Sequence, residues 1–167
     1  MLPANWEKFA QAHQKNYQQL LKKISLPGSK KLRNIVLDLL PELHDTAFAQ
    51  IDCLQCGNCC KNHSPRFKQP DIKRIAKRLK IKEGELIQRF LKLDEENDYV
   101  TQRNPCPFLN EDNTCKIYDD RPSDCARYPY TDEDVLLDRP SLTVKNTTVC
   151  PITFQVLEAI LLKVGNK

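Results

Sequence analysis

Residues 53–60, CLQCGNCC, place four cysteines within eight positions, and two of them are adjacent. Each CxxC spacing is one by which a tight turn brings two thiolates to the same metal ion. Gly57 and Asn58 suit such a turn because neither side chain resists a left-handed backbone. Adjacent cysteines project in different directions, so we expect Cys59 and Cys60 to be ligands of different metals, or one ligand and one structural thiol.

The other four cysteines lie in the second half of the chain, at Cys106, Cys115, Cys125 and Cys150. Eight thiols fit two mononuclear sites of four thiolates, one binuclear site, or one iron–sulfur cluster with spare cysteines. In a reducing compartment, cysteines are kept for metal binding or catalysis rather than for disulfides. We therefore expect a metal site, and the even number of cysteines leaves a disulfide framework as the alternative.

The chain of 167 residues, 40% of them hydrophobic, is long enough for one compact domain with an appendage. Its first 20 residues lack the basic and apolar regions of a signal peptide, and no stretch approaches the roughly 18 apolar residues that span a bilayer. We expect a cytoplasmic protein without a membrane segment.

Charge is distributed unevenly along the chain. Residues 61–92 carry eleven Lys or Arg against three acidic residues, and residues 94–138 are rich in acidic clusters. This segregation indicates one basic and one acidic surface, although solvated helix faces explain it more simply. A nucleic-acid-binding role through the basic helix at 68–82 is disfavoured, because aromatic residues are few and the net charge is only +4.

Apolar residues at three- and four-residue spacing predict most of the chain to be helical. Residues 5–44 are expected to form two antiparallel helices joined by the Pro-Gly turn in LPGS. A third helix is predicted in KQPDIKRIAKRLKI, where Pro70 and Asp71 suit the first turn, and a short fourth helix in KEGELIQRFLKL. The last helix is predicted to begin at Pro151.

The segments YVTQ and VLLDRPSLTVK contain β-branched residues and are expected to form two or three short strands. The predicted fold class is mainly α, with a small α+β fold as the variant: a helical domain with irregular cysteine-rich loops and a few short strands. The predicted division is an N-terminal helical hairpin over residues 1–48 and a cysteine-cluster domain over residues 49–167.

The order of motifs resembles a known family. CLQCGNCC, then CPFL, then TCKIYDDRPSDCARYPY and a final Cys-Pro are similar to the YkgJ-type cysteine-cluster (CxxCxxCC) family of zinc- or iron-chelating domains, over about residues 50–152. One departure is Ala126, where we expect Arg after the cysteine. The resemblance implies a metal or iron–sulfur centre built by Cys53, Cys56, Cys59, Cys60, Cys106, Cys115, Cys125 and Cys150.

Zinc is the first choice for this centre, and iron or an iron–sulfur cluster is the alternative. All-thiolate zinc explains the cysteines without a cluster assembly pathway. The CxxCxxC run and the Cys-Pro pairs are also typical of bacterial ferredoxin clusters. Arg121 and Arg127, beside Cys125, are candidates to offset the negative charge of four thiolates, although an exposed structural Arg explains each equally well.

Other candidate residues have simpler explanations. His63 would give a mixed site, but a surface histidine of the turn is favoured, and His13 and His44 fit packing or capping roles. Tyr118, Tyr128 and Tyr130 are expected to cover the metal loops rather than to react. The acidic residues near the second cysteine group, which an enzyme would need as bases, are more simply solvated turn residues: Asp119, Asp120 and Asp124.

These patterns favour a metal-binding protein over an enzyme. The sequence has no Gly-rich phosphate loop, no HExxH and no Ser-His-Asp pattern. The alternative is a metal-dependent or iron–sulfur-dependent enzyme for redox or modification chemistry, which would need an open metal position. The helical hairpin over residues 1–48 is the expected surface for a protein partner.

Overall fold

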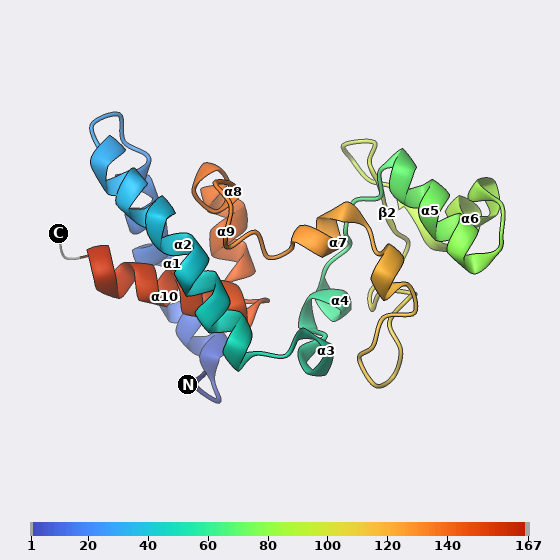
Figure 1. Cartoon of the computed structure of the whole chain (residues 1–167), viewed down its shortest axis with the longest axis horizontal. Coiled ribbons are helices and arrows are strands. Elements are labelled where there is room, and N and C mark those ends of the chain that lie inside the picture. The colour runs from blue at the N-terminus through green and yellow to red at the C-terminus, as the bar shows by residue number, and fades with distance from the viewer. Residues whose placement is uncertain (1, 166–167) are drawn as a thin grey trace. The chain divides into compact units, whose positions relative to one another are not determined.

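The computed structural model describes residues 2–165 and is mainly α-helical, which confirms the predicted fold class. Figure 1 shows its helices and its one small sheet. The elements in chain order are α1 (Trp6–Ile24), α2 (Lys30–Gln50), α3 (Cys53–Cys56), α4 (Asn58–Asn62), α5 (Gln69–Leu79), α6 (Glu83–Phe90), β1 (Leu91–Leu93), β2 (Tyr99–Thr101), the 3₁₀ helix η1 (Tyr118–Asp120), α7 (Ser123–Arg127), α8 (Val135–Asp138), α9 (Pro140–Asn146) and α10 (Pro151–Val164).

The chain divides into two compact units. Unit 1 comprises residues 1–52 and 129–167, and unit 2 comprises residues 53–128. The N-terminal and C-terminal parts of the chain thus belong to the same unit. The sequence-based division at residue 48 stays a prediction about domains.

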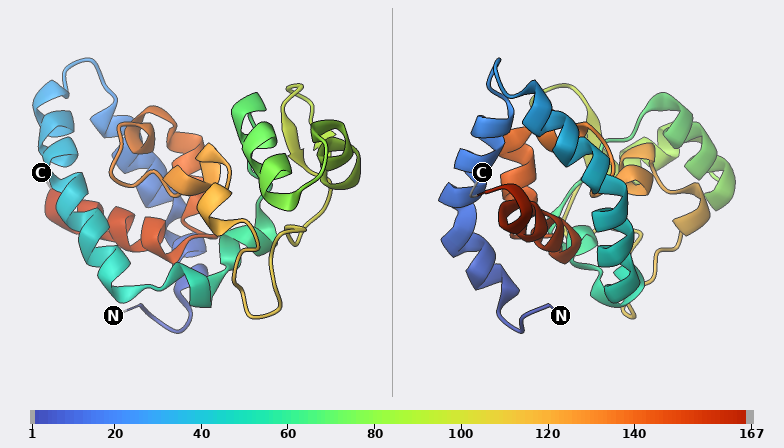
Figure 2. Two further views of the ribbon diagram at one scale, coloured as in Figure 1. Left: turned by 45° about the vertical axis from the view of Figure 1, so that its right-hand side comes forward. Right: turned by 60° about the vertical axis from the view of Figure 1, so that its left-hand side comes forward.

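Unit 1 is built on the predicted helical hairpin. Helices α1 and α2 pack against the apolar α10, and Figure 2 shows α10 between them. The helix α10 buries one side chain after another because neighbours cover it on several faces, whereas α1 buries only a stripe. The largest fully buried side chains of the unit are Tyr17, Leu21, Ile24, Leu40, Leu136, Leu137, Ile152 and Leu157.

A polar contact joins α1 to α10 inside this unit. The hydroxyl of Tyr17 donates to Glu158 Oε1 at 2.6 Å, and His13 Nδ1 lies 2.8 Å from the same oxygen. Burial of the phenol, together with its hydrogen bond to Glu158, raises the pKa of Tyr17. The buried hydroxyl is therefore satisfied by a carboxylate on the helix against which it packs.

Helix α2 continues six residues beyond the predicted end at residue 44 and contains Pro41. The apolar face explains the extension, because Leu43 and Ala47 are both buried on the same side as Val36 and Leu40. Tertiary burial along this face offsets the cost of a proline within the helix.

The strand predicted in VLLDRPSLTVK is wrong, because residues 135–146 form α8 and α9. Pro140 occupies the first turn of α9, a position where its missing N–H is not needed. Leu136 and Leu137 of α8 and Val144 of α9 are buried in unit 1. Packing thus overrides the strand propensity of the β-branched residues.

No single helix within residues 2–165 is both long and apolar enough to cross a bilayer. Helices α9 and α10 meet the length and composition criteria only when taken together, and a bend of 116° separates them.

Unit 2 has a smaller core formed by α5, α6 and the sheet. Helix α5 contributes Ile72, Ile75 and Ala76, at the spacing that the sequence predicted. Cys106 and Cys115 pack against this core from its edge. The other buried members of the cluster are Phe67, Leu86, Leu91, Phe108 and Ile117.

The sheet of unit 2 is an antiparallel pair in which Leu91 lies opposite Thr101 and Leu93 opposite Tyr99. The strand predicted in YVTQ is confirmed as β2. The predicted fourth helix is shorter than the stretch KEGELIQRFLKL: α6 ends at Phe90, and Leu91 begins β1.

Asp71 in the first turn of α5 is a buried carboxylate with several donors. Its oxygens accept from the Lys68 N–H at 3.0 Å, from the Arg74 guanidinium at 2.8 Å and from the Ser123 N–H at 3.2 Å. Burial alone would raise the pKa of Asp71, but these hydrogen bonds lower it overall. The ionised carboxylate therefore stabilises unit 2.

We predict that Asp71→Asn lowers the free energy of unfolding at pH 7 by roughly 1.5–3 kcal/mol, because the amide is a weak partner for Arg74. Since the folded pKa is depressed, the contribution of the carboxylate is present above the ordinary value of about 3.9 and is lost as pH falls through the folded value. Urea unfolding at pH 7 and pH 3 should show the gap from wild type shrinking at acid pH. The exposed Glu95→Gln serves as the control, and a gap unchanged at pH 3 would contradict the assignment.

Gly57 adopts a left-handed backbone, with φ of 57°, between α3 and α4. A Cβ at this position would meet the Asn113 side chain at 3.0 Å. Asn113 itself donates to the Gln55 carbonyl at 2.9 Å and so closes the 106–115 loop over the turn. Only glycine combines this φ with this close approach.

We predict that Gly57→Ala destabilises the protein by at least about 1–2 kcal/mol, through backbone strain and the contact with Asn113. Gly84→Ala is the matched control, since nothing lies within 4 Å of a Cβ added in α6. It should be neutral or stabilise by up to about 1 kcal/mol. Equal melting temperatures for the two variants would refute the role of Gly57.

Candidate metal centre

None of the eight cysteines is joined to another by a disulfide bond in the structure. The first group lies on two short helices rather than in an irregular loop. Cys53 and Cys56 begin and end α3, and Cys59 and Cys60 lie in α4. Gly57 separates the helices, and its N–H donates to the Cys53 carbonyl at 2.9 Å. The left-handed glycine thus starts a new helix for the adjacent pair.

Backbone contacts bring the downstream cysteines to Cys60. The Cys106 N–H donates to the Cys60 carbonyl at 2.8 Å, which joins two segments 46 positions apart. Cys115 then pairs with Leu109 in an isolated antiparallel bridge, so the chain returns toward Cys106. Cys125 follows on α7.

Four of the thiols lie near enough to one another to interact electrostatically. Burial raises the pKa of Cys125, and Cys60, Cys106 and Cys115 raise it further. Burial likewise raises the pKa of Cys106 to about 11, with Cys60 and Cys115 contributing. Burial and Cys60 raise the pKa of Cys115. We call these four residues, Cys60, Cys106, Cys115 and Cys125, the tetrad.

Cys60 differs from the other three thiols of the tetrad. A hydrogen bond between Cys59 and Cys60, whose sulfurs lie 3.9 Å apart, lowers the pKa of Cys60 to about 7. Burial opposes this shift, and the Lys61 ammonium lowers the pKa further. Cys60 is therefore the member that carries negative charge most readily near neutral pH.

The other four cysteines lie outside the tetrad. Cys53 is exposed and Cys56 is half-buried. Cys59 lies beside the tetrad and contacts it at Cys60. Cys150 belongs to unit 1, where it is buried and precedes α10 as its N-cap. The single eight-cysteine ligand set implied by the resemblance stays a prediction.

The tetrad supplies the donor chemistry of a metal site without its closed geometry. Among residues 2–165, no three Cys, His, Asp or Glu side chains stand close enough to hold one ion as they lie. Four mutually interacting thiols from three segments nevertheless match the all-thiolate ligand set of structural zinc and of iron–sulfur clusters. Staggered cysteine rotamers give each sulfur more than one position on a fixed backbone. The residues present therefore fit a thiophilic metal.

Arg121 is a second cation that acts on the tetrad, and it lies in the chain between Cys115 and Cys125. Its positive charge counters the rise in the pKa of Cys115. The guanidinium lies 4.1 Å from the centre of the Tyr118 ring and donates to the Tyr118 carbonyl at 2.7 Å. Arg127 lies in α7, two residues after Cys125.

The three histidines lie in different surroundings. His63 follows α4 as its C-cap and packs edge-on against Tyr128, with ring centres 5.7 Å apart. His13 contacts Glu158, and His44 bonds to Thr131 at 2.9 Å, both within unit 1. Tyr130 has a left-handed backbone, at φ of 61°, at the start of the return to unit 1.

Sequence reasoning missed two kinds of supporting residue. Asn113 closes the 106–115 loop over Gly57, and an Asn between Asp112 and Thr114 is a recognisable turn signal. The contact of Asp71 with Ser123, 52 positions away, carries no local signal, because the first turn of α5 explains an acidic residue by itself.

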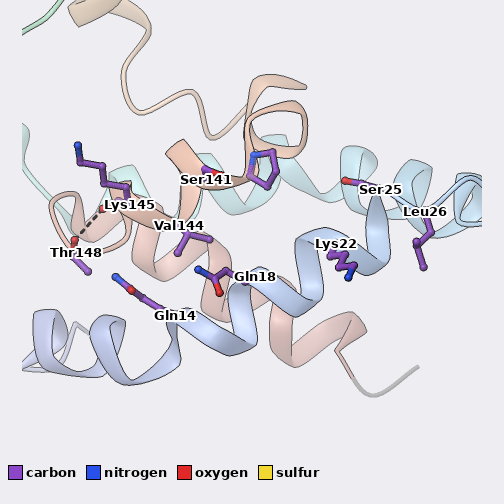
Figure 3. A pocket seen from close by; sticks show the side chains of 10 residues that line it. Gln14, Gln18, Lys22, Ser25, Leu26, Ser141, Val144, Lys145 and Thr148 are labelled. Carbon is purple, nitrogen blue, oxygen red and sulfur yellow. Dashed lines mark hydrogen bonds between the residues drawn. The ribbon is translucent and has the colours of Figure 1, made fainter.

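A groove of about 670 Å³ lies in unit 1 between α1 and α9, and Figure 3 shows the side chains that line it. Gln14, Gln18 and Lys22 line one side, and Ser141, Lys145 and Thr148 the other. No cysteine, histidine or carboxylate lines it. It offers none of the usual protein ligands of zinc or iron.

Comparison with known proteins places the cysteine-bearing part of the chain. Residues 52–151 match the model of the CxxCxxCC family, whose description is "Putative zinc- or iron-chelating domain". The match covers more than half of the chain and all eight cysteines. No curated protein and no solved structure gave a significant match. The chain therefore belongs to the CxxCxxCC family.

Proposed function

We propose that the protein binds zinc through Cys60, Cys106, Cys115 and Cys125. The observation that carries the proposal is the proximity of these four cysteines: the Cys106 N–H donates to the Cys60 carbonyl at 2.8 Å, and Cys60 raises the pKa values of the other three thiols. Bound zinc would supply a positive charge that attracts each of the four thiolates and so offsets their mutual repulsion. The backbone of the chain brings the four cysteines near one another, and Cys60 is the member whose pKa is lowered.

A four-thiolate site favours a binding or structural role over catalysis. A tetrahedral zinc ion with four protein sulfurs has no open position for water or substrate. Such a site leaves a net charge of −2, which Arg121, Lys61 and nearby backbone N–H groups would offset. The protein is then a metal-binding module, proposed to act in the cytoplasm.

Iron is the second candidate, and the first three cysteines favour it. Cys53, Cys56 and Cys59 keep the CxxCxxC spacing of iron–sulfur ligands, and they lie outside the tetrad. The spacing supports an iron–sulfur cluster on this run, and with it an electron-transfer or enzymatic role.

The deciding measurement is elemental analysis with an ultraviolet–visible spectrum, on protein purified without oxygen and without added metal. The proposal expects at least one zinc per chain and no visible absorbance. Iron with labile sulfide and a brown chromophore would overturn zinc binding in favour of an iron–sulfur cluster. Protein without bound metal that also fails to take up zinc would refute both.

We predict that Cys125→Ser loses one zinc per chain and melts at a lower temperature, because metal binding by a structural site contributes directly to folding. Cys53→Ser is the control, since this exposed thiol lies outside the tetrad and should leave the tetrad's ion in place. Metal content and melting curves of both variants decide the ligand set. Unchanged zinc in Cys125→Ser would exclude this residue as a ligand.

A further inference from the structure

Asp71 and Arg74 form an ion pair at the start of α5, with Arg74 Nη2 2.8 Å from Asp71 Oδ1. The Asp71 side chain is 3% exposed and the Arg74 side chain 40%, so the pair reaches from the interior of unit 2 to its surface. Neither residue contributes to a ligand set or to the hydrophobic core described above. Apart from the local bond of Asp71 to Lys68, the other contacts of the pair within residues 2–165 lie in the segment between Cys115 and Cys125, and they include an ion pair of Arg74 with Asp120.

Three backbone groups of that segment bind the pair. Arg74 Nε donates to the Asp120 carbonyl at 3.3 Å, and Arg74 Nη2 donates to the Arg121 carbonyl at 2.9 Å. The Ser123 N–H donates to Asp71 Oδ1 at 3.2 Å, and its hydroxyl donates to Asp71 Oδ2 at 3.3 Å. The planar guanidinium is suited to this arrangement, because its fork reaches a carboxylate and two carbonyls at once.

The segment that receives these bonds is poorly stabilised by its own structure. η1 spans three residues and α7 spans five, and helices this short do not form without tertiary contacts. Cys125 lies on α7, two residues after Ser123. A fixed position for α7 therefore depends on contacts such as those made by the pair.

The bonds of the pair to this segment run mainly to backbone groups. Two of them use separate nitrogens of the Arg74 guanidinium, so they depend on its forked shape and not only on its positive charge. Replacing Arg74 with another cation should therefore not preserve its effect on the tetrad.

We propose that Asp71 and Arg74 are positioning residues of the metal centre, which hold the backbone of residues 120–123 so that Cys125 meets the other thiols of the tetrad. The inference rests on the proposed function, because it assigns these residues a role in metal affinity. It concerns residues outside the cysteine motif, and it predicts a loss of affinity without the loss of a ligand.

The test is binding of Zn²⁺ and of the spectroscopic probe Co²⁺ to the full-length reduced protein, with folding checked by circular dichroism. The variants are Arg74→Lys, which keeps the charge but not the fork, and Ser123→Pro, which removes both donors to Asp71 at a first helical position where proline is tolerated. Arg89→Lys is the matched control, since Arg89 pairs with Glu85 at 2.8 Å on the exposed face of α6.

We expect both variants to stay folded and to bind Zn²⁺ about 10- to 100-fold more weakly than wild type, as is usual when groups that orient metal ligands are removed. Their Co²⁺ complexes should show weaker thiolate charge-transfer absorbance, and Arg89→Lys should match wild type in both. Wild-type affinity and spectra in both variants would overturn the positioning role while leaving the metal site intact. A wild-type protein that takes up neither ion overturns the proposed function, and the inference with it.

Discussion

The convergence of four thiols at the edge of a small core is the constraint on which unit 2 depends. Burial and mutual repulsion both raise the pKa values of Cys106, Cys115 and Cys125, so charging these thiols without a counter-ion is unfavourable. The chain must hold their segments together by other means. It does so with backbone contacts, of which the bond from Cys106 to Cys60 is the most direct.

Different parts of unit 2 hold the cysteine-bearing segments in place. The apolar face of α5 joins a core with α6 and the sheet, and Cys106 and Cys115 pack against that core. The first turn of the same helix binds the segment that carries Cys125. Gly57 and Asn113 fix the turn before Cys60. One helix therefore serves both the hydrophobic core and the placement of the thiols.

The sequence correctly predicted the helices that depend on the local spacing of apolar residues. The helical hairpin, α5 and α10 followed from apolar spacing and from prolines in first turns. Residues 135–146 were misassigned because β-branched residues there are buried on helices, which is a tertiary effect. The motif order identified the family, but spacing alone could not show which cysteines lie near one another. That proximity depends on contacts across 46 or more positions, such as the one that joins Cys60 to Cys106.

The adjacent residues Cys59 and Cys60 differ in their relation to the tetrad. Cys60 belongs to the tetrad, while Cys59 stands beside it with its sulfur 3.9 Å away and lowers the pKa of Cys60 through a hydrogen bond. A thiol beside the tetrad can thus favour the charged form of a thiol that belongs to it. If Cys59 were itself deprotonated, the same proximity would become a repulsion between two thiolates. The protonation of Cys59 and the charge on Cys60 are therefore coupled, so the CC pair is a single electrostatic unit even where only one of its sulfurs lies in the tetrad.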